Sequence, residues 1–236
     1  MANAPMEAGK RLKDEAEDGI VVSYLTLRTF VGALGVTLPF VLWLGGEWVF
    51  GLKLQPSMSA YYYTPMRDVF VGFLFAIGTF FITYRGHSRW DGVAGFAVCM
   101  FALGVALFPT TDCGPIVAGG CQAANSTTPF HAKVHFTSAA GLLITLAIFS
   151  LFLFTKSDPT QPMTTRKKWR NTIYRICGIV ILAMVAGAAY YVSEYPTCCV
   201  EQGPTLFVLE AVALVAFGLS WIVKGEAILA DVEPKP

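Results

Sequence analysis

The chain has 236 residues, of which 55% are hydrophobic and 14% are charged, and its mean hydropathy is +0.56. A soluble domain carries about 25% charged residues, so this composition excludes an ordinary soluble enzyme and a disordered protein. The 17 Lys and Arg residues against 16 Asp and Glu leave a net charge of +1. A nucleic-acid binder needs a basic surplus, so nucleic acid is excluded as a partner.

Six stretches are long and apolar enough to cross a bilayer as helices. A spanning helix needs roughly 20 mostly apolar residues, and each stretch is apolar around its whole circumference. The stretches are 25–44, 65–84, 92–108, 135–154, 173–192 and 205–223. They do not alternate apolar and polar residues, as the strands of a membrane β-barrel do. We therefore expect an all-α fold, a polytopic integral membrane protein built as a six-transmembrane-helix bundle.

The distribution of Lys and Arg predicts how these helices are oriented, because cytoplasmic loops carry the excess of basic residues. With the N-terminus inside, 14 of the 17 basic residues are cytoplasmic, and only Lys53, Arg67 and Lys133 lie on the other face. Both termini are thus expected in the cytoplasm. We expect a cytoplasmic N-terminal segment 1–24, a single transmembrane domain 25–224 and a cytoplasmic tail 225–236. Compact loops and short tails favour a bacterial inner (plasma) membrane.

The start of the chain predicts a retained signal anchor. Residues 1–23 are polar and mixed in charge, unlike the basic, acid-free start of a secretory signal peptide.

The six cysteines agree with this topology. Cys99 and Cys177 lie in predicted helices, where a free thiol acts as a small apolar side chain. The other four lie in the non-cytoplasmic loops after the third and fifth spans: Cys113, Cys121, Cys198 and Cys199. Such clustering in an oxidising compartment indicates disulfides. A bond between the adjacent Cys198 and Cys199 is sterically awkward, so we favour two bridges linking loops 109–134 and 193–204. A thiolate metal site is the alternative.

Glu210 is the clearest polar residue inside a predicted span, about 9 Å into the sixth helix at 1.5 Å per residue. A central charge costs about 2.5–3.5 kcal/mol on insertion scales. Glu210 is therefore either a structural carboxyl, protonated or hydrogen-bonded to a neighbouring helix, or a functional acid that handles protons or binds a head group.

Two histidines, His131 and His135, are four residues apart and share a helix face at the outer mouth of the fourth span. His-x-x-x-His is half of a zinc site, but zinc requires further ligands. Hydrogen-bonding interfacial histidines are the favoured interpretation, with no metal and no other cofactor. Haem is excluded because no opposing helix offers a second axial histidine at that depth.

The segment before the second span is rich in hydroxyl and aromatic side chains. Thr64 and Pro65 form a helix start signal, which places Arg67 and Asp68 in the first helical turn at the outer head-group level. Ser57 and Ser59 precede them. Serine, histidine and carboxylate on one face could provide a nucleophile, a base and an orienting acid. No G-x-S-x-G elbow is present, so the pattern only weakly indicates hydrolysis.

A basic stretch, 165–171, precedes the fifth span on the cytoplasmic side. Such a segment sets topology and binds anionic lipid, and docking of a partner protein is the alternative. Small-residue faces such as Ala183 and Gly187 permit close helix packing within or between chains, so a homo-oligomer stays open.

Three short segments carry a family resemblance, and the first is Pro56-Ser57-Met58-Ser59, followed by Pro65 and Val69-Phe70. It is similar to the Pro-x-Ile-Ser segment of the damage-regulated autophagy modulator (DRAM) family, which this chain resembles as a bacterial-type relative. The stretch from His135 to Gly141 resembles the opening of its fourth helix, and Glu210 with Phe217-Gly218 resembles its sixth. The resemblance covers nearly the whole chain in topology but only about a dozen residues in motif. Met58 in place of Ile and the four outer-loop cysteines depart from the family.

The resemblance implies a six-helix protein without a soluble domain that takes part in membrane lipid organisation or remodelling, with no agreed catalytic mechanism. The leading hypothesis for this chain is an outward-facing polar pocket that binds or organises membrane phospholipid. The candidate ligand-binding residues are Ser57, Ser59, Arg67, Asp68, His131, His135 and Glu210. One alternative is a membrane-embedded lipid hydrolase or acyltransferase that uses Ser59 and His135, or a metal. Another is a proton-coupled transporter that uses Glu210.

Overall fold

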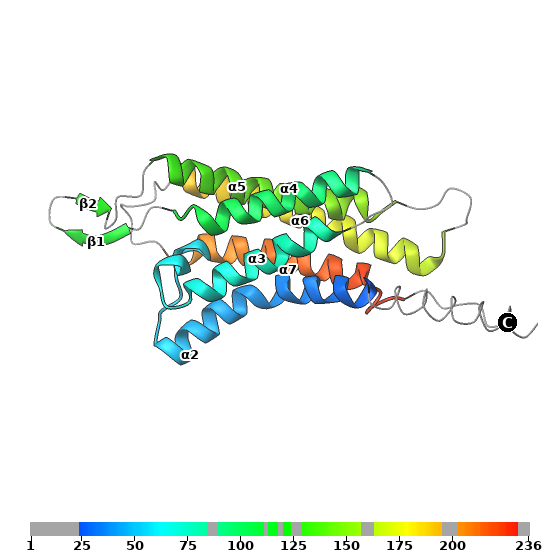
Figure 1. The fold of residues 1–236 in the computed structure, drawn as a ribbon, viewed down its shortest axis with the longest axis horizontal. Coiled ribbons are helices and arrows are strands. Elements are labelled where there is room, and N and C mark those ends of the chain that lie inside the picture. Colours follow the sequence, from blue (N-terminus) through cyan, green and yellow to red (C-terminus); the bar gives the residue numbers. More distant parts are fainter. Residues whose placement is uncertain are drawn as a thin grey trace, which may run out of the picture.

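The computed structural model describes residues 24–84, 89–110, 113–117, 120–123, 129–156, 163–194 and 203–230. Long helices lie side by side in an elongated bundle (Figure 1). They are the first helix Tyr24–Phe50, α3 Arg67–Thr83, α4 Arg89–Leu107, α5 with its continuation Pro129–Leu153, α6 Thr165–Glu194 and α7 Thr205–Lys224. Two of them contain a π-helical turn, η1 Val41–Gly45 and η3 Phe149–Leu153, and α2 Gly46–Phe50 completes the first helix.

The helical, multi-pass character predicted from the sequence is confirmed. Five of these helices are long and apolar enough to cross a membrane, all but α3. With 17 residues, α3 is about 25 Å long at 1.5 Å per residue. The departure from an all-α fold is small: β1 Cys113–Val117 and β2 Gly120–Ala123 form an antiparallel hairpin.

The bundle has two distinct ends. The β hairpin, α2 and the 3₁₀ helix η2 Ser59–Tyr63 lie at one end, which we call the hairpin end (Figure 1). The start of the first helix and the end of α7 lie at the opposite end, which we call the C-terminal end (Figure 1). Contact between Thr29 and Gly225 joins the two helices there.

The first helix and α7 touch through their backbones. A Cβ added at Gly218 would lie 2.5 Å from the Gly32 carbonyl oxygen, and one added at Gly32 would lie 2.7 Å from the Gly218 carbonyl oxygen. Small residues allow this approach, on which helix association in membranes depends because lipid provides little hydrophobic drive. Glycine is therefore required at this crossing.

An aromatic core fills the half of the bundle nearer the C-terminal end. Trp221 of α7 is fully buried, and six aromatic rings from three segments lie within 6.1 Å of its ring centroid. They belong to Phe80, Phe81, Tyr84, Phe149, Phe154 and Phe217. Several of these pairs meet edge to face, the geometry that aromatic quadrupoles favour. This core fixes α3, α5 and α7 relative to one another.

Candidate functional site

The segment between the first helix and α3 folds back onto the N-terminus of α7. The backbone N–H of Phe207 donates to the Pro56 carbonyl at 2.8 Å, and the backbone N–H of Met58 donates to Oε2 of Glu210 at 2.7 Å. The first contact satisfies one of the N–H groups that every helix leaves unpaired in its first turn. The second gives the half-buried Glu210 carboxylate a fixed partner. These two bonds hold residues 56–58 across the hairpin end of the bundle.

The same segment carries the two predicted serines. Ser57 and Ser59 are both buried, their hydroxyl oxygens lie 3.1 Å apart, and the Ser57 Oγ accepts a hydrogen bond from the Ala60 backbone N–H. Tyr61 is fully buried, with its ring 6.0 Å from that of Phe207. Burial raises the pKa of the Tyr61 hydroxyl, so it stays neutral. Packing thus holds Ser59 inside the bundle rather than at its surface.

His135 enters from α5 and is only 3% exposed. Its Nδ1 lies 2.7 Å from the carbonyl oxygen of Phe108, just after α4 ends. Since a carbonyl can only accept, Nδ1 carries the proton. In the neutral ring Nε2 is then an acceptor. This bond fixes the ring orientation at the junction of α4 and α5.

Ser59, His135 and Glu210 line one cavity of about 60 Å³, which is room for roughly four water molecules. The three side chains come from η2, α5 and α7, respectively. All the other lining side chains are apolar: Leu38, Met58, Phe70, Leu74, Ile77, Val105, Ala139, Leu142, Leu143, Leu146, Leu214 and Phe217. The cavity therefore combines apolar walls with three hydrogen-bonding groups.

The other predicted ligand-binding residues do not line this cavity. Arg67 and Asp68 are exposed, and the Arg67 guanidinium lies over the Tyr62 ring at 4.6 Å and donates to the Tyr62 hydroxyl at 3.2 Å. His131 is half-buried and its ring lies 5.6 Å from that of Phe108. The expected pocket that combines Arg67, Asp68 and His131 with Ser59, His135 and Glu210 is thus replaced by a smaller cavity.

The start of α3 explains why Arg67 and Asp68 are outside. The helix begins at Arg67, two residues after Pro65, because Pro65 and Met66 form a turn in which the Thr64 hydroxyl accepts the Met66 N–H at 3.2 Å. The first two residues of the helix, Arg67 and Asp68, are then exposed, whereas Phe70 is buried and lines the cavity.

The polar residues of the cavity do not form a preassembled catalytic triad. Within the described ranges, the Ser59 hydroxyl bonds to Ser57, the Glu210 carboxylate to Met58, and Nδ1 of His135 to a backbone carbonyl. The described part of the chain also contains no group of three or more His, Cys, Asp or Glu that could hold a metal ion. The cavity offers hydrogen bonds to a ligand in its present geometry.

The predicted disulfides lie outside the described side chains. Cys198 and Cys199 fall outside the described residues, and Cys113 and Cys121 are described by their backbone only, in β1 and β2. Cys99 and Cys177 are buried free thiols, as expected.

Two backbone groups also belong to the site, and the sequence did not predict them because nearly every residue type has the same backbone groups. The Phe108 carbonyl and the Met58 N–H hold His135 and Glu210, respectively. One signal was available, because a helix predicted to end at residue 108 leaves unpaired carbonyls that a neighbouring histidine can cap.

Comparison of the chain with known protein families, with curated proteins and with solved structures gives no significant match.

Proposed function

We propose that this protein binds a membrane lipid, whose polar group hydrogen-bonds to Ser59, His135 and Glu210 inside the bundle. The observation that supports this proposal is the convergence of these three side chains, from three separate segments, in one cavity with apolar walls. Polar side chains within spanning helices are costly unless they have a partner or a use. A lipid suits such a cavity because it supplies hydrogen-bonding groups and apolar chain together.

The size of the cavity limits what part of a lipid it accommodates. About 60 Å³ holds a hydroxyl group with one or two carbon atoms, but not a whole head group. The remaining chain then extends between the helices to the bilayer. Oε1 of Glu210 has no hydrogen-bond partner within the described part of the chain, so it is the acceptor that such a group meets first.

The topology in this proposal is six spans with both termini in the cytoplasm. The described chain starts and finishes at the same end of the bundle (Figure 1), which supports an even number of crossings, and we propose α3 as the sixth span. The described basic residues of that end outnumber those of the hairpin end, which are Lys53, Arg67 and Lys133. The positive-inside rule then makes the C-terminal end cytoplasmic. Reporter fusions at residue 230 and in the hairpin should report opposite sides of a bacterial inner membrane.

The DRAM-type resemblance is part of the same proposal. Its Pro-x-x-Ser segment and the acid of its last helix correspond here to Ser59 and Glu210, two of the three polar residues of the cavity. Lipid organisation is the activity that both arguments favour.

The test is to fill the cavity without touching its polar groups. Ala139 lines the cavity and Ala140, the next residue of α5, does not. Protein purified in mild detergent should retain bound lipid, measured by mass spectrometry of the extract, in the wild type and in Ala140→Leu. Ala139→Leu should lose it. Equal lipid in both variants would remove the cavity from the proposal, and Arg67→Ala should behave like the wild type because Arg67 is outside.

A lipid hydrolase or acyltransferase is the second candidate, favoured by the presence of Ser59, His135 and Glu210 in the same cavity. Catalytic hydrogen bonds often form only with substrate bound, so Ser59 would have to exchange its Ser57 bond for one to His135. A serine-directed fluorophosphonate should then label the wild type and not Ser59→Ala. Absence of labelling, with lipid still bound, leaves the binding proposal.

A further inference from the structure

Four cationic side chains from three helices meet at the C-terminal end of the bundle. They are Arg28 of the first helix, Lys167 and Arg170 of α6, and Lys224 at the end of α7, and we call them the four-cation cluster. The Lys224 ammonium interacts electrostatically with the other three cations and with the carboxylate of Glu226. Like charges at such range repel, and burial strengthens the repulsion because water screens it less. The arrangement therefore needs negative charge nearby.

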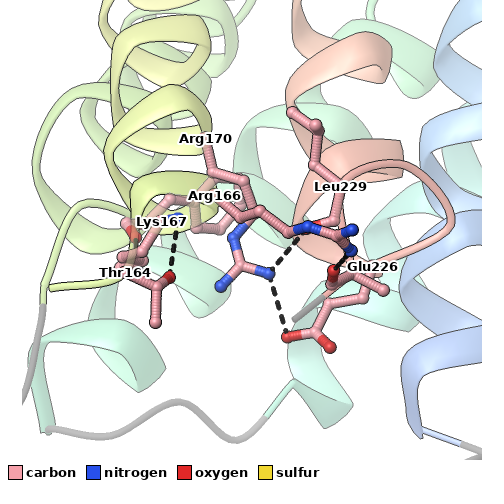
Figure 2. Close-up of polar contacts among 8 residues, drawn as sticks. Thr164, Arg166, Lys167, Arg170, Glu226 and Leu229 are labelled. Carbon is pink, nitrogen blue, oxygen red and sulfur yellow. Dashed lines mark hydrogen bonds and ion pairs between the residues drawn. The ribbon is translucent and has the colours of Figure 1, made fainter. Parts of the chain in front are cut away.

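Two of the four cations have structural partners. Arg170 is only 5% exposed, donates to the Leu229 carbonyl at 3.1 Å and pairs with Glu226 at 3.6 Å (Figure 2). Lys167 donates to the Phe154 carbonyl at 3.3 Å. Basic side chains commonly bind the carbonyls left unpaired where helices end. These two residues thus tie α6 to the chain after η3 and after α7.

Within the described chain, Arg28 and Lys224 lack such partners. Arg28 is 7% exposed, its guanidinium lies over the rings of Tyr24 at 4.1 Å and Tyr84 at 5.7 Å, and its Nε is buried without a hydrogen-bond partner in the described chain. Nζ of Lys224 lies 5.6 Å from the centre of the Phe154 ring. Aromatic faces attract cations, but they do not neutralise them. A buried guanidinium with an unsatisfied N–H is costly.

The described carboxylates do not neutralise this pair. Glu226 is engaged by Arg170, and Asp91 on α4 is engaged by Lys156 at 3.6 Å. Within the described ranges, neither carboxylate forms an ion pair with Arg28 or Lys224. Counted over the described residues, the cluster therefore has an excess of positive charge around a buried guanidinium N–H without a hydrogen-bond partner.

We propose that the four-cation cluster binds a phosphate group, and that in the membrane this phosphate belongs to an anionic phospholipid. Arg offers planar, paired donors and Lys a compact charge, and both bind phosphate well. Basic pockets between membrane helices on the cytoplasmic side bind phosphorylated head groups. Lys167 and Lys224 are only half-buried, so the site is open to the surface.

The position of the cluster favours a lipid as the source of the phosphate. It lies where α6 and α7 leave the bilayer in the proposed topology. Trp90 in the first turn of α4 and Trp169 in the first turns of α6 are 62% and 61% exposed near this end. Exposed Trp side chains are typical of the head-group level. A phosphate monoester such as that of phosphatidic acid carries more negative charge on its phosphate than a phosphodiester does, about −1.5 to −2 near pH 7, and is the preferred ligand.

The experiment compares Lys224→Gln with Lys168→Gln, which removes an exposed charge of the same basic stretch. The probes are dioctanoyl phosphatidic acid, dioctanoyl phosphatidylcholine and inorganic phosphate, and binding is followed by tryptophan fluorescence of the full chain in mild detergent. Wild type and Lys168→Gln should prefer phosphatidic acid. Lys224→Gln should lose about tenfold or more in affinity for it, the loss expected for one charge-assisted hydrogen bond.

The unfolding temperature without lipid provides the second readout. Lys224→Gln removes a repelling charge, so its unfolding temperature should equal or exceed that of the wild type. A lower value would overturn the proposal by making Lys224 a structural residue.

The binding measurements have three further outcomes that support or overturn the phosphate site or its lipid source. Inorganic phosphate that competes as well as the lipid, and loses binding in Lys224→Gln, would support the phosphate site and overturn the lipid source. Equal affinity of wild type and Lys224→Gln for phosphatidic acid would overturn the site. A wild-type protein that does not prefer phosphatidic acid would also overturn the site. This result is expected if carboxylates of segments 1–23 or 231–236 already neutralise the cluster. Ala139→Leu should leave this binding unchanged, so the two lipid proposals fail or stand separately.

Discussion

The carboxylate of Glu210 accepts a 2.7 Å hydrogen bond from the backbone N–H of Met58, a residue 152 positions earlier in the chain. The bond joins the segment before α3 to the last helix, and it places the acid at the boundary between the cavity and the hairpin end. Glu210 thus has a structural role, and its Oε1 has no hydrogen-bond partner among the described residues. The two alternatives that the sequence left open for this residue are compatible.

Substitution of Glu210 should separate the two roles. Glu210→Gln keeps an oxygen acceptor for the Met58 N–H, so it should lower the free energy of unfolding only slightly. Glu210→Leu leaves that N–H unsatisfied, at a cost of about 1–3 kcal/mol. Unfolding in mixed detergent micelles measures both. Equal stability of the two variants would show that the hydrogen bond is not maintained in the membrane.

The contact between the first helix and α7 predicts a strong effect of one methyl group. Gly218→Ala places a Cβ 2.5 Å from the Gly32 carbonyl oxygen, so the helices must separate, and we expect a loss of about 1–3 kcal/mol. Gly72→Ala on α3 is the matched control, because a Cβ at Gly72 has nothing within 4 Å. A thermal unfolding series of the two variants in one detergent checks this. Similar melting temperatures would contradict the close backbone contact.

The aromatic core predicts that Trp221 contributes more to stability than any surface tryptophan. Trp221→Ala should cost about 3–5 kcal/mol, the range for large side chains removed from packed cores. Trp221→Phe should cost much less, because it keeps most of the ring contacts and removes an indole N–H that has no partner in the described chain. Trp90→Ala, at a site 62% exposed, should be nearly neutral. Denaturant titration of all three gives the order directly.

The two disulfides stay a prediction, with a direct test by thiol counting. Under native, non-reducing conditions an alkylating reagent should modify none of the six cysteines, since Cys99 and Cys177 are buried. Unfolding without reductant should expose two thiols, and unfolding with reductant six. Six reactive thiols before reduction would exclude the bridges between loops 109–134 and 193–204. Peptide mapping of the oxidised form then gives the pairing.

Hydropathy predicts where helices cross a membrane better than where they end. The fifth span was expected from residue 173, but α6 starts at Thr165, because the helix also includes the polar stretch 165–171. Its 30 residues are longer than the roughly 20 that hydrocarbon requires. The first helix likewise continues to Phe50 through the π-helical turn at Val41–Gly45. Apolar composition therefore predicts the apolar part of each helix, but not the residue at which the helix begins or ends.

The sequence predicted which polar residues of the spans are candidates for the site, but not which helix faces point into the bundle. Ser59, His135 and Glu210 were candidates because polar groups stand out in apolar sequence, and they line one cavity. Arg67 and Asp68 were expected beside them but are exposed. A helix that is apolar all round carries no stripe to show which face is inward, so sequence could not assign the first turn of α3 to either side. The predicted helix end at residue 108 was the one signal for the Phe108 carbonyl that holds His135.

The two hydrogen bonds between residues 56–58 and α7 also set an order for the steps of folding during synthesis. Pro56 and Met58 leave the ribosome early, whereas their partners Phe207 and Glu210 follow about 150 residues later. At roughly 5–20 residues per second, the partners of the early segment are synthesised about 8–30 s later. The hydrogen bonds that close the hairpin end therefore form only after the last helix has been inserted. A chain truncated before α7 should expose the Met58 N–H and the Ser59 hydroxyl, and we expect membrane proteases to degrade it.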